Sequence, residues 1–267
     1  MEQPKNNLKI VADKKSARML LPNMLTLIGV CIGLTSIRFA LDGRFELAII
    51  AIMFAALIDG LDGRIARLIK GTSKVGKELD SLTDMISFGV APAFIMYFWK
   101  LNTLGRFGWL LCLVFVICVA LRLARFNINS NQEPSWRDNF FEGVPSPAGG
   151  ILVLTPLIIS LSGFDFFQLN YDIIVPIFFV TTSFLLISKF PSYSFKKIVI
   201  RRKTTIFLLF GIVLFFGLLL VYTFNVIAIS AIIYLLLLPI SYFHYQKIKN
   251  KHEKDKIQDE DDLEDVL

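Results

Sequence analysis

Residues 59–84 read DGLDGRIARLIKGTSKVGKELDSLTD, and this stretch carries four aspartates where two apolar runs meet. Asp59 and Asp62 are three residues apart, and Asp80 and Asp84 are four residues apart. Residues three or four apart share one face of a helix. A short connection makes the two helices antiparallel neighbours. We therefore expect the four carboxylates to converge on one site at the cytoplasmic side of a membrane.

The chemistry of this expected cluster suits a hard divalent cation. Carboxylates offer oxygen ligands only, and Mg²⁺ and Mn²⁺ prefer oxygen ligands. The chain has two histidines, His244 and His252, and both lie near its C-terminal end, so neither is placed to recruit zinc. Ion pairing, for example of Asp62 with Arg67, explains one intramembrane aspartate better than it explains four.

The sequence around the stretch is typical of a polytopic membrane protein. Of the 267 residues, 55% are apolar and 19% are charged, whereas soluble domains average roughly 45–50% and 25%. A membrane-spanning helix takes about 20 apolar residues and satisfies its own backbone hydrogen bonds. We therefore expect an all-α polytopic fold with about eight transmembrane helices. The apolar runs are 21–41, 46–68, 82–99, 107–126, 147–163, 173–190, 205–223 and 225–244.

The distribution of basic residues predicts the orientation of these helices. If the N-terminus is cytoplasmic, 24 Lys and Arg residues fall in inside segments, and the outside loops hold only Arg44, Lys100 and Arg106. By the positive-inside rule, both termini are expected in the cytoplasm. The net charge of +6 then indicates contact with anionic lipid and no nucleic-acid partner, because the basic clusters are not interleaved with stacking aromatics.

Three segments are expected along the chain. Residues 1–19 form a basic cytoplasmic leader, residues 20–245 the membrane domain, and residues 246–267 a charged and mobile cytoplasmic tail that turns from basic to acidic. The run that follows the leader is longer than the ~7–15-residue core of a secretory signal. We therefore expect it to be retained as the first transmembrane helix.

Glycines accompany the aspartates of the second run. Gly60 and Gly63 lower helix stability at these positions, and with Ala66 they leave a smooth strip beside the carboxylates. A substrate phosphate or sugar could approach the backbone there. The strip is equally typical of a small-residue seam between packed helices, and the two interpretations are compatible.

Eight positions of the stretch resemble the signature of the CDP-alcohol phosphatidyltransferase family, D-x2-D-G-x2-A-R-x8-G-x3-D-x3-D. The matching residues are Asp59, Asp62, Gly63, Ala66, Arg67, Gly76, Asp80 and Asp84. Other segments are similar to the branch of this family whose acceptor is L-serine: ELDSLTDMISFGVAPA at 78–93, LRLARFN at 121–127, GVPSPAGG at 143–150 and PSYSFKK at 191–197. With LPNMLT at 21–26, the resemblance covers about residues 20–245.

The resemblance implies an enzyme of the inner cell membrane with its active site facing the cytoplasm. The implied reaction transfers the phosphatidyl group of CDP-diacylglycerol to L-serine and gives phosphatidylserine and CMP. It assigns Asp59, Asp62 and Asp80 as ligands of two divalent ions, Mg²⁺ or Mn²⁺, and Asp84 as both ligand and general base. The CDP side is assigned to Gly63, Ala66, Arg67 and Gly76, and members of the family commonly form homodimers.

Further polar residues are candidates for substrate binding. Asn23 and Thr26 follow Pro22 at the inner end of the first run, where they either cap that helix or touch the nucleotide. Arg122 and Arg125 either bind the serine carboxylate or a lipid phosphate, or anchor the inner face of the membrane domain. The remaining candidates for these substrate groups are Lys74, Lys196, Lys197 and Ser87.

Three alternatives remain open at this point. Another alcohol of the same family, such as glycerol 3-phosphate, inositol phosphate or choline, could replace serine as acceptor. An ion-coupled transporter would also carry intramembrane aspartates, although transporters often show repeated halves with matching broken helices. A non-catalytic scaffold would leave the four aspartates without a purpose. Because no histidine lies outside the C-terminal end, we expect direct in-line attack rather than a covalent histidine intermediate.

Overall fold

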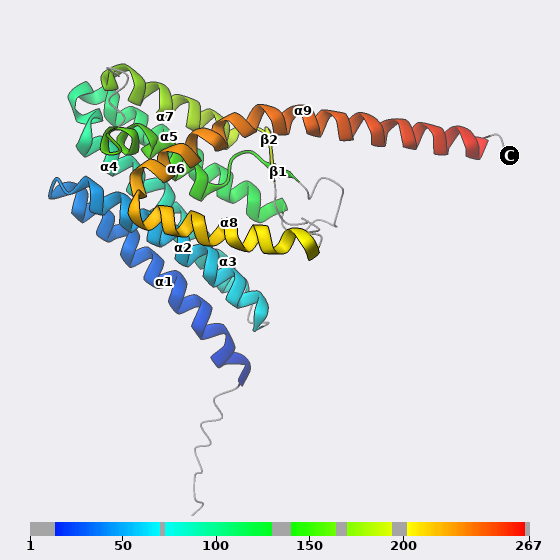
Figure 1. Ribbon diagram of the computed structural model, residues 1–267, viewed down its shortest axis with the longest axis horizontal. Helices are drawn as coiled ribbons and strands as arrows, with labels where there is room; N and C mark the ends of the chain where they lie inside the picture. The colour runs from blue at the N-terminus through cyan, green and yellow to red at the C-terminus, as the bar shows by residue number, and fades with distance from the viewer. Residues whose placement is uncertain (1–13, 70–72, 130–139, 164–169, 194–201, 265–267) are drawn as a thin grey trace, which may run out of the picture.

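The computed structural model describes residues 14–69, 73–129, 140–163, 170–193 and 202–264, and nearly all of them are helical (Figure 1). A π-helical turn η1 (Met85–Val90) joins α3 to α4, so these three form one continuous segment. The helices are α1 (Lys14–Leu41), α2 (Phe45–Leu68), α3 (Lys74–Asp84), α4 (Ala91–Trp99), the 3₁₀ turn η2 (Leu101–Leu104), α5 (Arg106–Asn129), α6 (Ser146–Leu161), α7 (Tyr171–Ile187), α8 (Arg202–Val221) and α9 (Thr223–Glu264).

The expectation of a helical membrane fold is confirmed by these segments. When α3, η1 and α4 are taken together, the described chain has eight long helical segments, one for each apolar run. Four of them, at 21–41, 75–99, 106–128 and 223–248, are long and apolar enough to cross a membrane. Helices α6, α7 and α8 are apolar but shorter, and α2 carries the charged stretch at its C-terminal end.

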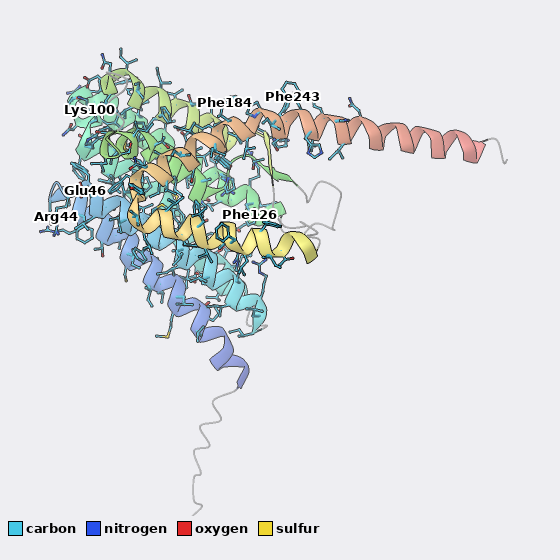
Figure 2. All side chains as sticks on the ribbon, viewed as in Figure 1. Arg44, Glu46, Lys100, Phe126, Phe184 and Phe243 are labelled. Carbon is cyan, nitrogen blue, oxygen red and sulfur yellow. The ribbon has the colours of Figure 1, made fainter. Side chains whose placement is uncertain are left out.

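Much of the surface of the bundle is apolar. Phe184 and Phe243 are 71% and 70% exposed, and they project outward from α7 and α9 (Figure 2). Arg44 and Lys100, two of the basic residues expected on the outer side, lie at the same end of the bundle in this view. An outward apolar surface of this kind is suited to contact with lipid.

Two short strands are the exception to the all-α expectation. β1 (Phe140–Glu142) pairs antiparallel with β2 (Pro191–Tyr193), so that Phe141 lies opposite Ser192. Strands of three residues are too short to produce an alternating apolar pattern, and therefore they could not be predicted from the sequence. Helix α9 packs against β2, which places the two-stranded sheet beside this helix.

The ends of two helices differ from the expected boundaries. Helix α1 begins at Lys14, so Pro22 lies inside the helix and the interpretation of Asn23 and Thr26 as capping residues is wrong. Helix α9 runs on to Glu264, so the expected division at residue 246 falls within a helix. Residues 1–13 of the expected leader lie outside the described ranges.

The π-helical turn η1 is held between two helices by glycines. A Cβ atom on Gly33 of α1 would lie 2.5 Å from Ser87 Oγ, and one on Gly150 of α6 would lie 3.0 Å from the carbonyl oxygen of Phe88. Ser87 and Phe88 are fully buried. Because η1 follows Asp84 directly, this close packing also fixes where the Asp84 side chain lies.

Candidate active site

The four aspartates of residues 59–84 meet between α2 and α3. Carboxylate oxygens of Asp59, Asp62 and Asp80 all lie within 4.8 Å of one another. Asp84 interacts electrostatically with Asp59 and Asp80, so the fourth aspartate lies beside the same cluster. Asp62 is buried, and the other three are half-buried.

Local structure explains why the two pairs face each other. Helix α1 packs against both α2 and α3 and so holds them on either side of the cluster. Helix α3 starts at a defined point because the Ser73 hydroxyl accepts a hydrogen bond of 2.9 Å from the backbone N–H of Gly76. A serine in this position satisfies one of the unpaired N–H groups of the first turn.

A pocket of about 170 Å³ opens beside Asp62 and Asp80. Its walls come from the N-terminal half of α1, the C-terminal end of α2 and the start of α3. The lining residues are Pro22, Asn23, Thr26, Asp62, Gly63, Ala66, Ser73, Gly76, Lys77 and Asp80. The structure thus brings together five of the six residues expected to bind the nucleotide lipid.

The sixth of these residues, Arg67, does not line the pocket. Its side chain is exposed, and its Nε donates a hydrogen bond of 3.1 Å to the carbonyl oxygen of Gly63 in the preceding turn. No salt bridge with Asp62 forms among the described residues. The ion-pair explanation of Asp62 therefore finds no support in the structure.

Two of the pocket glycines leave space for different reasons. Nothing lies within 4 Å of a Cβ atom built on Gly63, so this face of α2 is open. At Gly76 a Cβ atom would lie 2.8 Å from Asn23 Oδ1 and 3.1 Å from Ser73 Oγ. A larger residue at position 76 would require the Asn23 and Ser73 side chains to shift.

Thr26 connects the pocket to the aspartate cluster. Its Oγ1 atom lies 2.8 Å from Asp62 Oδ2 and 2.9 Å from the carbonyl oxygen of Pro22. Both Thr26 and Asp62 are buried, at 4% and 3% exposure. The hydroxyl can donate its proton to the carboxylate and so keep one Asp62 oxygen in a fixed orientation.

A second polar group lies on the other side of Asp84. Arg122 of α5 is 9% exposed, donates from Nη1 to the Ser146 hydroxyl and interacts electrostatically with Asp84. Two buried atoms in this group, Asp84 Oδ1 and Arg122 Nε, have no hydrogen-bond partner among the described residues. Buried polar atoms are normally paired, so these two are free to bind a ligand.

The other candidates for serine or phosphate binding lie elsewhere or are not described. Arg125 donates from Nη1 to the carbonyl oxygen of Ile187 at 2.6 Å and so closes the end of α7. The Ser87 hydroxyl donates to the carbonyl oxygen of Gly29 at 3.4 Å, within the contact between η1 and α1. The side chain of Lys74, and all of Lys196 and Lys197, fall outside the described parts of the chain.

Sequence reasoning missed several residues near the site. Ser73 and Lys77 line the pocket, and Ser146 pairs with Arg122. The preference for serine at helix N-termini could have identified Ser73. Lys77 donates to the backbone carbonyl of Asn127 at 3.3 Å, but in the sequence it resembles any other basic residue of the inner side.

The aspartate cluster fits a divalent cation by charge and by donor type. None of the four carboxylates forms a salt bridge among the described residues, and Arg122 is the cationic group that interacts with Asp84. Carboxylates at such separations repel one another in a site of low dielectric constant. All the donors are oxygens, as Mg²⁺ and Mn²⁺ require.

Comparison with known proteins agrees with the family resemblance seen in the sequence. The family model described as CDP-alcohol phosphatidyltransferase matches residues 19–185, which include the aspartate cluster, the pocket and Arg122. The match ends before α8 and α9.

Several curated relatives carry the name CDP-diacylglycerol–serine O-phosphatidyltransferase. One from Mycobacterium leprae is 43% identical over 176 residues, which are 64% of this chain and 57% of that protein. One from Helicobacter pylori is 37% identical over 197 residues, 74% of this chain and 81% of the relative. One from Bacillus subtilis is 34% identical over 177 residues, 66% of this chain and 92% of the relative. The chain thus spans little more than half the length of the mycobacterial protein.

Proposed function

The chain belongs to the CDP-alcohol phosphatidyltransferase family, and from that premise we propose that it transfers the phosphatidyl group of CDP-diacylglycerol to L-serine. The products are phosphatidylserine and CMP. The observation that carries the proposal is the cluster of Asp59, Asp62, Asp80 and Asp84 beside an open pocket. The printed names of the relatives support serine as the acceptor.

We propose that the aspartates hold two divalent ions. Asp59, Asp62 and Asp80 are the proposed ligands whose oxygens lie closest to one another. Asp84 lies beside Asp59 and supplies a further carboxylate oxygen. When bound, the ions neutralise the negative charge of the diphosphate and make CMP a better leaving group. The residues around them hold the substrates in line for displacement.

Asp84 is the proposed base. Its Oδ1 atom is buried and has no hydrogen-bond partner among the described residues, so it can accept the proton of the serine hydroxyl. The serine oxygen forms its bond to the phosphatidyl phosphorus as the bond from that phosphorus to the CMP oxygen breaks. This direct attack inverts the configuration at phosphorus, whereas two successive displacements would retain it.

The pocket of about 170 Å³ is the proposed site of the cytidine diphosphate group. Gly63 and Ala66 give the ligand access to the backbone of α2, and Asn23 offers an amide for hydrogen bonding. Lys77 adds a positive charge at the wall of the pocket. The open face at Gly60 and Gly63 leaves room for the diacylglycerol part to remain in the lipid.

Arg122 is the proposed partner of the serine carboxylate. Replacing Arg122 by Lys keeps the charge but loses the planar fork of donors that matches a carboxylate. We expect the KM for serine to rise by about 10-fold or more, because hydrogen bonds to charged groups contribute about 1.5–3 kcal/mol. The measurement is initial-rate kinetics at varied serine. Arg38→Lys, at an exposed pair with Asp42, is the control, and an unchanged KM in Arg122→Lys would contradict the assignment.

Thr26 is expected to set the affinity for the cation through Asp62. Thr26→Val keeps the shape of the side chain but removes the 2.8 Å hydrogen bond to Asp62 Oδ2. Losing a group that orients a metal ligand typically lowers metal affinity or activity by about 10–100-fold. We expect the half-saturating Mg²⁺ or Mn²⁺ concentration to rise accordingly, and Thr26→Ser to restore it. Equal cation dependence in both variants would count against this role.

We propose that the protein lies in the inner cell membrane with both termini and the active site on the cytoplasmic side, as a homodimer. The Lys and Arg count of the loops supports the orientation, and family resemblance supports the dimer. A cysteine placed at the exposed Asp42 position between α1 and α2 should react with an impermeant thiol reagent added outside intact cells. The cytoplasmic C-terminal tag of the same protein should remain protected from added protease.

The test of the function is CMP release by the purified, detergent-solubilised protein. It receives CDP-diacylglycerol, Mg²⁺ or Mn²⁺, and in parallel arms L-serine, glycerol 3-phosphate, inositol phosphate or choline. Release that requires both serine and cation supports the proposal. If CMP is released with another alcohol, the proposed cation site stands but the acceptor is not serine. If no acceptor gives release, the assignment as an enzyme is wrong.

A further inference from the structure

Three buried polar atoms without hydrogen-bond partners gather around Arg122. They are Asp84 Oδ1, Arg122 Nε and the hydroxyl oxygen of Tyr234, and none has a partner of normal geometry among the described residues. Arg122 interacts electrostatically with both Asp84 and Tyr234. The three groups come from α3, α5 and α9, which are far apart in the sequence. Tyr234 belongs neither to the aspartate cluster nor to the pocket beside it.

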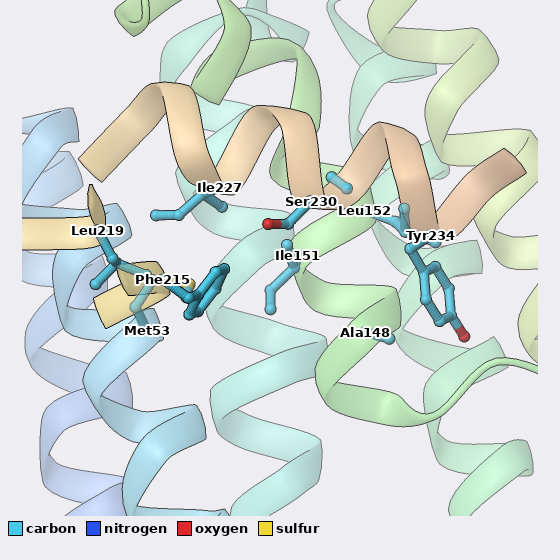
Figure 3. A pocket seen from close by; sticks show the side chains of 10 residues that line it. Met53, Ala148, Ile151, Leu152, Phe215, Leu219, Ile227, Ser230 and Tyr234 are labelled. Carbon is cyan, nitrogen blue, oxygen red and sulfur yellow. The ribbon is translucent and has the colours of Figure 1, made fainter. Parts of the chain in front are cut away.

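The ring of Tyr234 faces a different environment from its hydroxyl. The ring lines an apolar pocket of about 190 Å³ between α2, α6, α8 and α9, together with side chains such as Met53 and Phe215. Figure 3 shows the Tyr234 hydroxyl pointing away from Met53 and Phe215, at the end of the pocket near Ala148. Ala148 is two residues from Ser146, the partner of Arg122. Because Arg122 lies close enough to Tyr234 to interact with it electrostatically, we place the phenol oxygen on the Arg122 side of the apolar pocket.

Each of the hydroxyl groups near this phenol makes one other hydrogen bond. The Ser192 hydroxyl of β2 lies beside the phenol and donates its own proton to the carbonyl oxygen of Gly143 at 2.8 Å, but its contact with the Tyr234 oxygen does not reach normal hydrogen-bond geometry. The Ser146 hydroxyl accepts from Arg122 Nη1. A buried phenol without a partner loses the hydrogen bond that it makes in water. A ligand acceptor group beside Arg122 would restore that bond.

The charge around Arg122 indicates which ligand group fits. The described groups next to the guanidinium are the neutral hydroxyls of Ser146 and Tyr234 and the carboxylate of Asp84. Because the Asp84 carboxylate already lies beside this one cation, the group of residues suits a ligand of low negative charge, such as a carboxylate with its single negative charge. It matches a phosphate monoester less well, because that group carries about 1.5–2 negative charges at neutral pH.

We propose that the Tyr234 hydroxyl, together with Arg122, binds the carboxylate of the amino-acid acceptor and so selects it over acceptors that carry a phosphate. This inference rests on the proposed function. It adds a donor from α9, outside residues 19–185 that match the family model. The acceptor hydroxyl then points toward Asp84 Oδ1, the third unpaired atom.

The test compares Tyr234→Phe with Tyr222→Phe in the full-length protein. Tyr234→Phe keeps the ring in the apolar pocket and removes only the hydroxyl. Tyr222, between α8 and α9, is 58% exposed and receives the same chemical change. For Tyr234→Phe we expect the KM for L-serine to rise about 10- to 100-fold, as for loss of a hydrogen bond to a charged group. The KM for CDP-diacylglycerol and the cation dependence should stay as in the wild type.

Thermal stability separates ligand binding from a structural role. Because the phenol is unpaired in the free protein, Tyr234→Phe should leave Tm unchanged or raise it. A lower Tm or a failure to fold would overturn the inference, since it would mean that the hydroxyl supports the structure itself. An unchanged KM for serine would also overturn it while leaving the proposed function intact. A wild-type protein that uses only a phosphate-bearing alcohol would refute both.

Discussion

Asp84→Asn is expected to lower serine-dependent CMP release by about 10²–10⁴-fold, the range typical for loss of a general base. The amide has nearly the same shape as the carboxyl group, so packing around η1 should persist. It cannot accept the proton of the serine hydroxyl as a carboxylate does. It also removes a negative charge from the cluster with Asp59 and Asp80, which weakens cation binding. Raising the Mg²⁺ or Mn²⁺ concentration should therefore recover only part of the rate.

The matched control for this substitution is Asp172→Asn. Asp172, near the start of α7, forms a 3.0 Å salt bridge with Lys100 at the end of the bundle where Arg44 also lies. An exposed pair of this kind contributes little to stability, about 0–1 kcal/mol. Rates for this variant should equal those of the wild type. If Asp84→Asn retained most of its activity at saturating cation, another residue would have to be the base.

Gly33→Ala is expected to have the largest effect on stability. The new Cβ atom would lie 2.5 Å from Ser87 Oγ and 3.1 Å from Ser87 Cα. The second of these is a backbone atom of a fully buried turn, so relief requires α1 and η1 to move apart. Overpacking of this kind typically costs about 1–3 kcal/mol. Because Ser87 is three residues from Asp84, activity should fall together with Tm.

Gly211→Ala is the control, and we expect it to raise stability where Gly33→Ala lowers it. Gly211 lies within α8, and no heavy atom lies within 4 Å of a Cβ atom built there. Alanine in a helix interior is favoured over glycine by about 0.5–1 kcal/mol. Thermal unfolding in detergent should therefore separate the two variants in opposite directions. A Gly33→Ala protein as stable as the wild type would show that η1 is not held by close contact with α1.

Much of the fold could be predicted because membrane helices leave a strong pattern in the sequence. Each apolar run corresponds to a helical segment, and the spacing of Asp59, Asp62, Asp80 and Asp84 was sufficient to predict their convergence. That convergence depends on local geometry alone, since both pairs lie on neighbouring helices. The beginning of α1 was missed because its first turns are polar and basic. Such residues can form a helix, but they show no run of apolar residues that would mark it in the sequence.

The surroundings of Asp84 could not be predicted for a different reason. Arg122, Ser146 and Tyr234 lie on α5, α6 and α9, and only tertiary packing brings them together. The π-helical turn depends equally on packing, because Gly33 and Gly150 come from helices 117 residues apart in the sequence. Local patterns carry no information about such contacts.

The cation proposed above would be shared by two helices, because the four aspartates are distributed over both. Asp59 and Asp62 belong to α2, and Asp80 and Asp84 belong to α3 or its end. A cation shared by both pairs therefore fastens one helix to the other. By mass action, an ion that binds only the folded chain raises the free energy of unfolding by about 2.7 kcal/mol at 100 times its Kd. A chelator added during purification would thus destabilise the membrane domain as well as remove the activity.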